Sequence, residues 1–320
     1  MNQPEFERRH AALWERLDRL CTMLAAGQSG DVADFPREYR LLCQQLAVAR
    51  GRLYGLALIE RLEQLALRCH HQLYGGRRSL PRGLLNFLLL EFPAAIRAHR
   101  RAVLLAMLFF FGPALIVIAI GQSRPEVTHA VLGGEMMQAL QQMYDPTADQ
   151  FQTDREPGAD VGMFGFYIEH NIGIGLICFA MGLFWGVGSI AALAYNGLVL
   201  GAASVYVVEL GYQSTFFPFI IGHGAFELPA IVLMGAAGLD LGLALLSPKR
   251  LTRGEALRTT AHSVLPLVLG GAAMLVMAAT LEAFWSPRPQ IPIGIKYTLG
   301  TLLWLLVAAH WLFAGRRHAA

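Results

Sequence analysis

Charged side chains are scarce in this sequence. Asp, Glu, Lys and Arg make up 15% of its 320 residues and hydrophobic residues 55%, whereas a soluble globular domain carries about 25% charge. The mean hydropathy is +0.44. This composition excludes an ordinary soluble enzyme and predicts an all-α fold, a polytopic membrane bundle of helices.

Cysteine is scarce as well. The four cysteines, Cys21, Cys43, Cys69 and Cys178, show no CxxC spacing. Three of them fall in the part that we assign to the cytoplasm, where disulfides are rare, so we expect four thiols. A cleavable signal peptide is also missing, because residues 1–18 are charged and helical rather than apolar. We therefore expect insertion to begin at the first span, near residue 102.

The first quarter of the chain carries helical periodicity without a membrane span. Phe6, Leu13, Leu17, Leu20 and Leu24 recur at helical spacing, and similar stripes continue to residue 73. We expect residues 1–80 to form a cytoplasmic helical domain with no nucleotide or nucleic-acid motif. Residues 83–101 are apolar but short and interrupted, which predicts an interfacial elbow helix after a hinge at 75–78.

Six apolar stretches follow, and together they define a transmembrane domain at 102–315. Basic clusters at 97–101, 249–258 and 316–318 fall on one side of this scheme, while seven acids lie in the loop 122–165. The positive-inside rule therefore places both termini in the cytoplasm. The expected spans are 102–121, 168–190, 196–212, 216–247, 262–282 and 294–314.

The second and third spans share one long uncharged segment. No charged residue occurs between Asn171 and Val208, about 57 Å as a helix against a hydrocarbon core of about 30 Å. The segment must fold back, and we place the turn at Tyr195, Asn196 and Gly197. Its glycines predict close helix packing. A pair of re-entrant half-helices is the alternative.

The fourth span carries the motif around which the sequence is organised, residues 222–230. His223 and Glu227 are four apart and so share one helix face. An acid inside a membrane costs about 2.5–3.5 kcal/mol, and such residues usually face a protein interior or a wet cavity. The predicted motif residues are His223, Gly224, Glu227, Pro229, Asn171, Asn196 and Gly197.

Three further polar residues, Glu169, His170 and Glu209, are expected toward the outer leaflet, where they could line a cavity together with His223. We expect no cofactor and no metal, because the fourth span has no HExxH motif and the acidic loop has no calcium-loop spacing. If a metal does bind, its candidate ligands are His170, His223 and Glu227.

Taken as a set, these residues resemble the stage II sporulation protein M family. The resemblance rests on Asn171, Phe179, the glycines at 182, 186, 197 and 201, and the His-Gly-x-x-Glu-Leu-Pro-Ala run that begins at His223. It covers roughly residues 95–315. It implies an integral membrane protein of the bacterial cytoplasmic membrane that acts as a scaffold or assembly partner in an envelope complex.

Three interpretations of the motif stay open. In the first, Glu227 specifies packing and the protein is a scaffold, not an enzyme, with the lipid bilayer and other membrane or envelope proteins as partners. In the second, Glu227 and His223 serve a proton- or ion-coupled transporter or channel. In the third, they belong to an intramembrane metalloenzyme. A homodimer could form through the glycine faces, and no nucleic-acid partner is expected.

Overall fold

The computed structural model describes residues 2–25, 34–74, 80–147 and 158–315. All regular elements within these ranges are helical, which confirms the all-α class. The predicted hinge at 75–78 and the basic residues 316–318 lie outside the described residues. The chain divides into two compact units, Met1–Gly83 and Leu84–Ala320.

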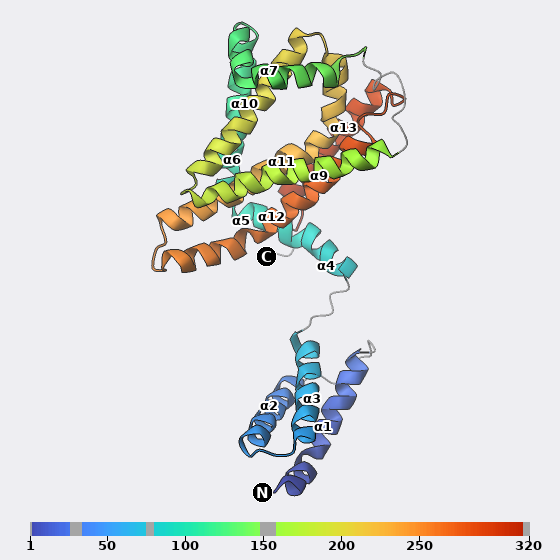
Figure 1. Ribbon diagram of the computed structural model, residues 1–320, viewed down its shortest axis with the longest axis vertical. Coiled ribbons are helices and arrows are strands. Elements are labelled where there is room, and N and C mark those ends of the chain that lie inside the picture. Colours follow the sequence, from blue (N-terminus) through green and yellow to red (C-terminus); the bar gives the residue numbers. More distant parts are fainter. Residues whose placement is uncertain (1, 26–33, 75–79, 148–157, 316–320) are drawn as a thin grey trace. The chain divides into compact units, whose positions relative to one another are not determined.

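The N-terminal unit contains three helices, α1 (Gln3–Ala25), α2 (Phe35–Gly51) and α3 (Leu56–Tyr74), which contact one another (Figure 1). The helical stripes of the sequence turn inward. Trp14, Leu17, Leu42 and Leu62 are each at most 1% exposed, and the Trp14 indole N–H donates to Gln45 Oε1 at 2.6 Å. This unit therefore has an apolar core of its own.

The elbow segment starts at the end of the first unit and lies mostly in the second. It consists of α4 (Leu80–Asn86), a five-residue π-helix η1 (Phe87–Glu91) and α5 (Phe92–Ala98). The π-helical stretch leaves the carbonyl of Leu88 to accept from His310 Nε2 at 2.8 Å. Arg97 donates to the carbonyl of Ala314 at 2.7 Å. The elbow is therefore fastened to the C-terminal helix.

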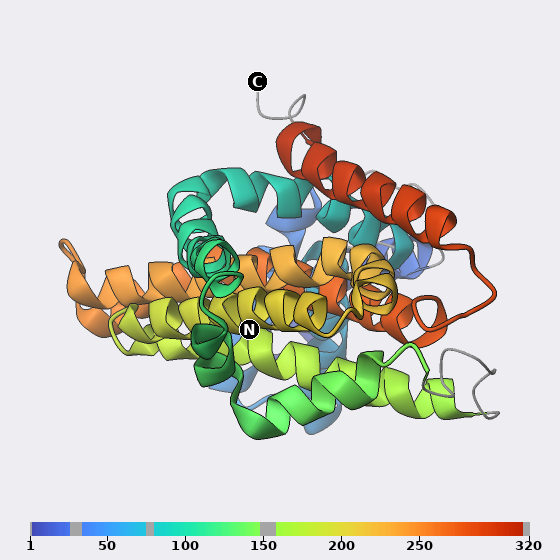
Figure 2. The same ribbon diagram turned by 90° about the horizontal axis from the view of Figure 1, so that it is seen from above.

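Six helices of the described residues are long and apolar enough to cross a membrane, the number that the sequence predicts. They form a bundle in which α9 and α12 run alongside α11 (Figures 1 and 2). Their bounds are α6 (Arg100–Gly121), α9 (Ala159–Ala180), α10 (Val187–Glu209), α11 (Gln213–Leu246), α12 (Arg253–Phe284) and α13 (Ile293–Phe313).

Helix α11 is the centre of this unit. It contacts α6, α9, α10, α12 and α13, and 78% of its most apolar stretch is buried. Two prolines, Pro218 and Pro229, lie inside it, and each removes one backbone hydrogen bond of the helix. The helix that carries the motif is thus enclosed by protein along most of its length.

Glycines bring the helix backbones together, as the sequence predicts. A Cβ at Gly197 in α10 would strike the carbonyl of Phe110 in α6, and one at Gly182 would strike the backbone of Gly238 in α11. No side chain other than hydrogen fits at such contacts. Close backbone approach of this kind is how helices associate in lipid, where apolar burial alone gives little driving force.

The reversal between the second and third spans lies earlier than expected. The chain turns at the 3₁₀-helix η2 (Met181–Leu183) and Gly186, whose φ is 79°. The expected turn residues 195–197 instead lie inside α10, where Asn196 Nδ2 donates to the carbonyl of Ala192 at 2.8 Å. The placement at 195–197 was wrong, because a left-handed glycine reverses a chain whereas an Asn-Gly pair can remain helical.

The stretch after the first span contains helix α7 (Pro125–Tyr144), which bends at Gly133, where φ is 70° and ψ is 166°. It contacts α10 and α6. Its last residue, Tyr144, is 6% exposed and packs edge-on against Phe216 and Phe219 of α11. Residues 148–157 of the acidic stretch lie outside the described part of the chain.

Candidate functional site

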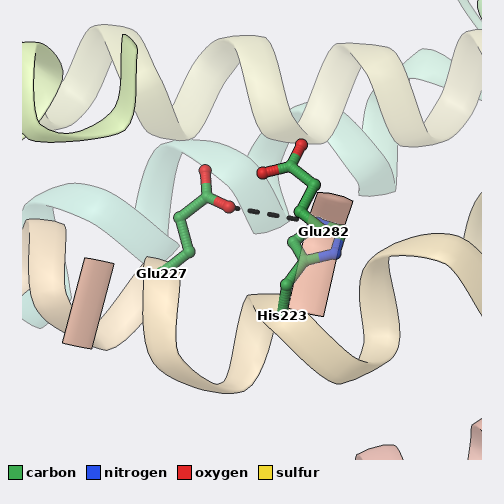
Figure 3. Close-up of side chains that lie close together, drawn as sticks. All are labelled: His223, Glu227 and Glu282. Carbon is green, nitrogen blue, oxygen red and sulfur yellow. Dashed lines mark ion pairs between the residues drawn. The ribbon is translucent and has the colours of Figure 1, made fainter. Parts of the chain in front are cut away.

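Helix α11 presents His223 and Glu227 on one face, as their spacing predicts. The distance from His223 Nε2 to Glu227 Oε2 is 3.9 Å, and their side chains are 6% and 19% exposed (Figure 3). The Phe219 ring packs edge-on against the imidazole with centroids 5.3 Å apart. Both groups are therefore held inside the protein, close to each other.

A third ionisable side chain, Glu282, joins them from α12. One potential ligand atom from each of His223, Glu227 and Glu282 lies within 4.8 Å of the other two. Figure 3 shows the two carboxylates pointing toward the same space beside α11. Asn171 of α9, which is 2% exposed, donates from Nδ2 to Glu282 Oε2 at 3.2 Å. Three spans thus contribute to one polar cluster.

The cluster opens on a cavity of about 320 Å³. Most of its lining is apolar, as is usual for a ligand-binding cavity with a few polar groups that fix orientation. The polar side chains in the lining are Tyr144, Asn196, His223, Glu227 and Glu282.

Tyr144 links the cavity to α7. Burial, and after it the negative charge of Glu282, raises the pKa of the Tyr144 phenol well above its usual range. The phenol therefore stays protonated and neutral over the physiological pH range. A neutral hydroxyl in the lining adds hydrogen-bonding capacity to the cavity without adding charge.

Buried hydrogen bonds fix the position of the His223 ring on the side of Nδ1. Its Nδ1 lies 3.1 Å from Ser286 Oγ, and the carbonyl of Ser286 accepts from Lys296 Nζ at 2.7 Å. All three residues are at most 8% exposed. Trp285 packs against Gly222, where a Cβ would come within 2.6 Å of the indole. The segment that follows α12 therefore fixes the ring of His223.

A second polar site lies farther along α11. Asp240 Oδ2 lies 2.6 Å from His99 Nδ1, and both residues line two further cavities, of about 320 Å³ and about 580 Å³. The hydrogen bond with Asp240 raises the pKa of His99, against an opposing effect of burial. Arg97, Arg101 and Lys249 line the larger cavity.

The other predicted outer residues lie apart from the cavity beside Glu227. Glu169 and His170 are exposed on α9, and His170 stacks on Phe166. Glu209 lies 3.6 Å from His129 of α7. None of the three is among the described residues that line the cavity.

The structure brings together four of the residues named in the predicted motif, His223, Gly224, Glu227 and Asn196, at the cavity itself. Asn171 reaches it through Glu282. Gly197 instead packs against α6. Pro229 is buried within α11, two residues beyond Glu227.

Sequence reasoning missed Glu282, Ser286 and Tyr144 as members of the site. Glu282 offered one signal, since it is the only charged residue between 259 and 287. It lay at the predicted end of a span, where an acid is ordinary. Ser286 and Tyr144 carried no signal of their own, because their roles depend on contacts across the fold.

Comparisons with known proteins cover both units. A family model described as stage II sporulation protein M matches residues 102–287. A second model, described as a domain of unknown function (DUF8413), matches residues 4–75. No curated protein and no solved structure matches the chain. The first match contains every residue of the cluster and its neighbour Ser286.

Proposed function

The chain belongs to the stage II sporulation protein M family, and from that premise we propose that this multi-pass membrane protein moves protons or small cations through the cavity beside Glu227. The observation that carries the proposal is the cavity of about 320 Å³ lined by two carboxylates, Glu227 and Glu282, inside a bundle of spanning helices. Ionisable groups within a membrane are costly, and by default they indicate a functional site, of which a pathway for ions or protons is one kind.

The arrangement along α11 supports transport over a purely structural acid. Glu227 and Asp240 lie about 20 Å apart on one helix, and each lines a cavity. Between them, Val232, Leu233 and Met234 are fully buried. Two cavities that each have ionisable groups in the lining, separated by a closed segment, are expected of a transporter that is closed at its middle.

The distribution of basic residues indicates which end of this pathway faces the cytoplasm. Arg97, Arg100, Arg101 and Lys249 surround the cavity at His99 and Asp240. By the positive-inside rule this end faces the cytoplasm. The cavity at Glu227 then opens toward the outer half of the membrane. The protein as a whole sits, in this proposal, in a bacterial cytoplasmic membrane.

The test is ion flux through purified protein in lipid vesicles, followed with a dye for internal pH and with cation-selective indicators. We expect Glu227→Gln to reduce flux to the level of empty vesicles, because the amide cannot take up or release a proton or balance a cation. Glu169→Gln, an exposed acid on α9, is the matched control and should keep wild-type flux. Absence of flux in wild-type vesicles under every gradient applied would refute the proposal.

Gly224 provides a variant that narrows the cavity without removing a charge. It lines the cavity, and a Cβ built on it has no atom within 4 Å. Gly224→Ala should therefore fold normally, with a helix stabilised by up to about 1 kcal/mol, and should still lower flux because its methyl group occupies the cavity. Unchanged flux in a well-folded Gly224→Ala protein would argue against passage through this cavity.

A second candidate is the scaffold or assembly role that the family resemblance implies. The observation in its favour is the separate N-terminal unit, which has its own core and its own domain match and which an ion pathway does not need. Cross-linking and purification of the chain from native membranes tests it. Recovery of a specific envelope protein that is lost on deletion of residues 1–83 would support the scaffold role, and recovery of no partner would count against it.

A further inference from the structure

Two acids and an imidazole lie unusually close together in the membrane unit. Their ligand atoms are within 4.8 Å of one another. At that distance two carboxylates repel strongly in a medium of low dielectric constant. The repulsion disappears only if a proton or a cation lies between them. A bound cation between the two carboxylates is one of the two ways to remove this repulsion, and protonation of one carboxyl is the other.

We propose that His223, Glu227 and Glu282 bind a divalent transition-metal ion of the Zn²⁺ type. This inference rests on the proposed function, because it names the cation of the same cavity. One imidazole nitrogen and two carboxylate oxygens are a donor set that suits Zn²⁺ and its neighbours in the first transition row. Alkali cations do not favour an imidazole ligand, so the histidine points to a transition metal.

Hydrogen bonds orient the His223 imidazole as a metal ligand. Its Nδ1 lies 3.1 Å from the Ser286 hydroxyl, whose residue is held in turn through its carbonyl by Lys296. With a proton on Nδ1, Nε2 carries the lone pair and faces Glu227. Metal-bound histidines commonly donate their other ring nitrogen in this way, and that hydrogen bond fixes the tautomer.

Glu282 is oriented by the same kind of contact. Asn171 Nδ2 donates to Glu282 Oε2 at 3.2 Å and so orients the carboxylate. An amide that donates to a carboxylate stabilises the ionised form that a metal ion needs. Two of the three ligands therefore have a hydrogen-bonding neighbour that holds them toward the cluster.

A metal ion would draw the ligand atoms, which lie within 4.8 Å of one another, closer together. Ligand atoms around a tetrahedral Zn²⁺ are about 3.4 Å apart, against 3.9 Å between His223 and Glu227. Three protein ligands leave one coordination position for the cavity side, where Gly224 contributes no side chain. An open position is the mark of an exchangeable or reactive metal site and not of a closed structural one.

Metal binding to the full-length protein tests the inference. The chain is purified in detergent, incubated with Zn²⁺, desalted and analysed for metal, and Co²⁺ is used in parallel for its absorption spectrum. We expect about one ion per chain. Glu282→Gln keeps the size of the side chain and should lower the affinity at least tenfold, as should His223→Ala. Ser286→Ala should lower it by about tenfold through the lost hydrogen bond.

The matched controls are His170→Ala and Glu169→Gln, which remove the same chemical groups from exposed positions on α9. Both should bind metal as the wild type does. Wild-type protein that is monodisperse and metal-free after incubation would overturn the inference. Metal binding that persists unchanged in a folded Glu282→Gln protein would overturn it as well.

The inference and the proposed function fail in different ways. Bound metal without flux would refute transport and leave the metal site standing. Wild-type protein that stays metal-free after incubation with Zn²⁺ but still carries flux, abolished by Glu227→Gln, would overturn the metal site and leave a proton pathway.

Discussion

Both units of the chain are helical, but the contacts that stabilise the interior differ between them. In the N-terminal unit, large side chains fill the interior: Trp14, Phe6 and Leu17 are each at most 2% exposed. In the membrane unit, backbones meet directly at glycine, as where Gly197 lies against Phe110. One unit packs side chains and the other brings its helix backbones together.

The surfaces differ in the same sense. The N-terminal unit carries exposed ion pairs such as Arg50 with Glu63. Helix α6 of the membrane unit instead exposes Leu104 and Leu108, which are 64% and 63% accessible. Burial of apolar side chains stabilises a protein in water. In lipid, a leucine has an apolar environment both inside the helix bundle and on its surface. Helices in lipid therefore gain stability from close packing and from buried polar contacts.

The first way to break this comparison is to remove a large core residue of the N-terminal unit. Trp14→Ala deletes a fully enclosed indole and its hydrogen bond to Gln45. We expect a loss of about 3–5 kcal/mol in the free energy of unfolding, measured by urea unfolding of residues 1–83 produced alone. Trp14→Phe is the milder control. A loss below about 1 kcal/mol would show that side-chain packing does not dominate there.

The second variant tests the backbone contacts of the membrane unit. Gly197→Ala introduces a methyl group where the carbonyl of Phe110 already lies. We expect it to cost about 1–3 kcal/mol, because the helices must separate, and to lower the thermal unfolding temperature in detergent. Gly173→Ala on α9 is the control, since a Cβ there meets no atom within 4 Å. Equal behaviour of the two variants would contradict the proposed role of glycine.

The third prediction concerns pH. The bond to Asp240 raises the pKa of His99, so the protonated pair stabilises the fold below the unfolded-state pKa of about 6.5 and loses that effect as pH rises through the folded-state pKa. His99→Gln should therefore cost about 1 kcal/mol at mildly acidic pH and less at alkaline pH. Thermal unfolding across pH measures this difference. A difference that grew with pH would contradict the sign.

The smallest effect is expected at the surface of the N-terminal unit. Arg50 and Glu63 approach to 2.7 Å, but their side chains are 59% and 43% exposed. Glu63→Gln should change the free energy of unfolding by less than about 1 kcal/mol and should matter still less in high salt. A larger, salt-independent loss would mean that charge contributes to the N-terminal unit as packing does.

Most of the fold could be predicted because the residues of each short segment determine whether that segment prefers water or lipid. An uncharged stretch such as that after Asn171 must be in the membrane. Helical spacing around Leu17 gave the N-terminal helices. The turn near Gly186 could not be located, because a left-handed φ is available to many of the glycines in this segment and only contacts with α11 select one of them.

The candidate site was predictable only where one helix contains it. His223 and Glu227 are four residues apart and therefore lie on the same face of a helix. Glu282 joins them because α12 runs antiparallel beside α11, and Asn171 because α9 packs on α12. Spacing within one span encodes neither helix pairing nor register. The sequence therefore predicted Glu169 and His170 beside the motif, whereas the structure places Glu282 and Asn171 there.

The sequence by itself determined the membrane, the number of spans, the family and the motif, because these depend on composition and on the spacing of neighbours along one chain. Only the tertiary structure decided what surrounds Glu227: a second carboxylate, an oriented histidine and a cavity between helices. The physical reason is that charge repulsion and hydrogen bonding act over a few ångströms in space, and residues 227 and 282 become neighbours only when the helices pack.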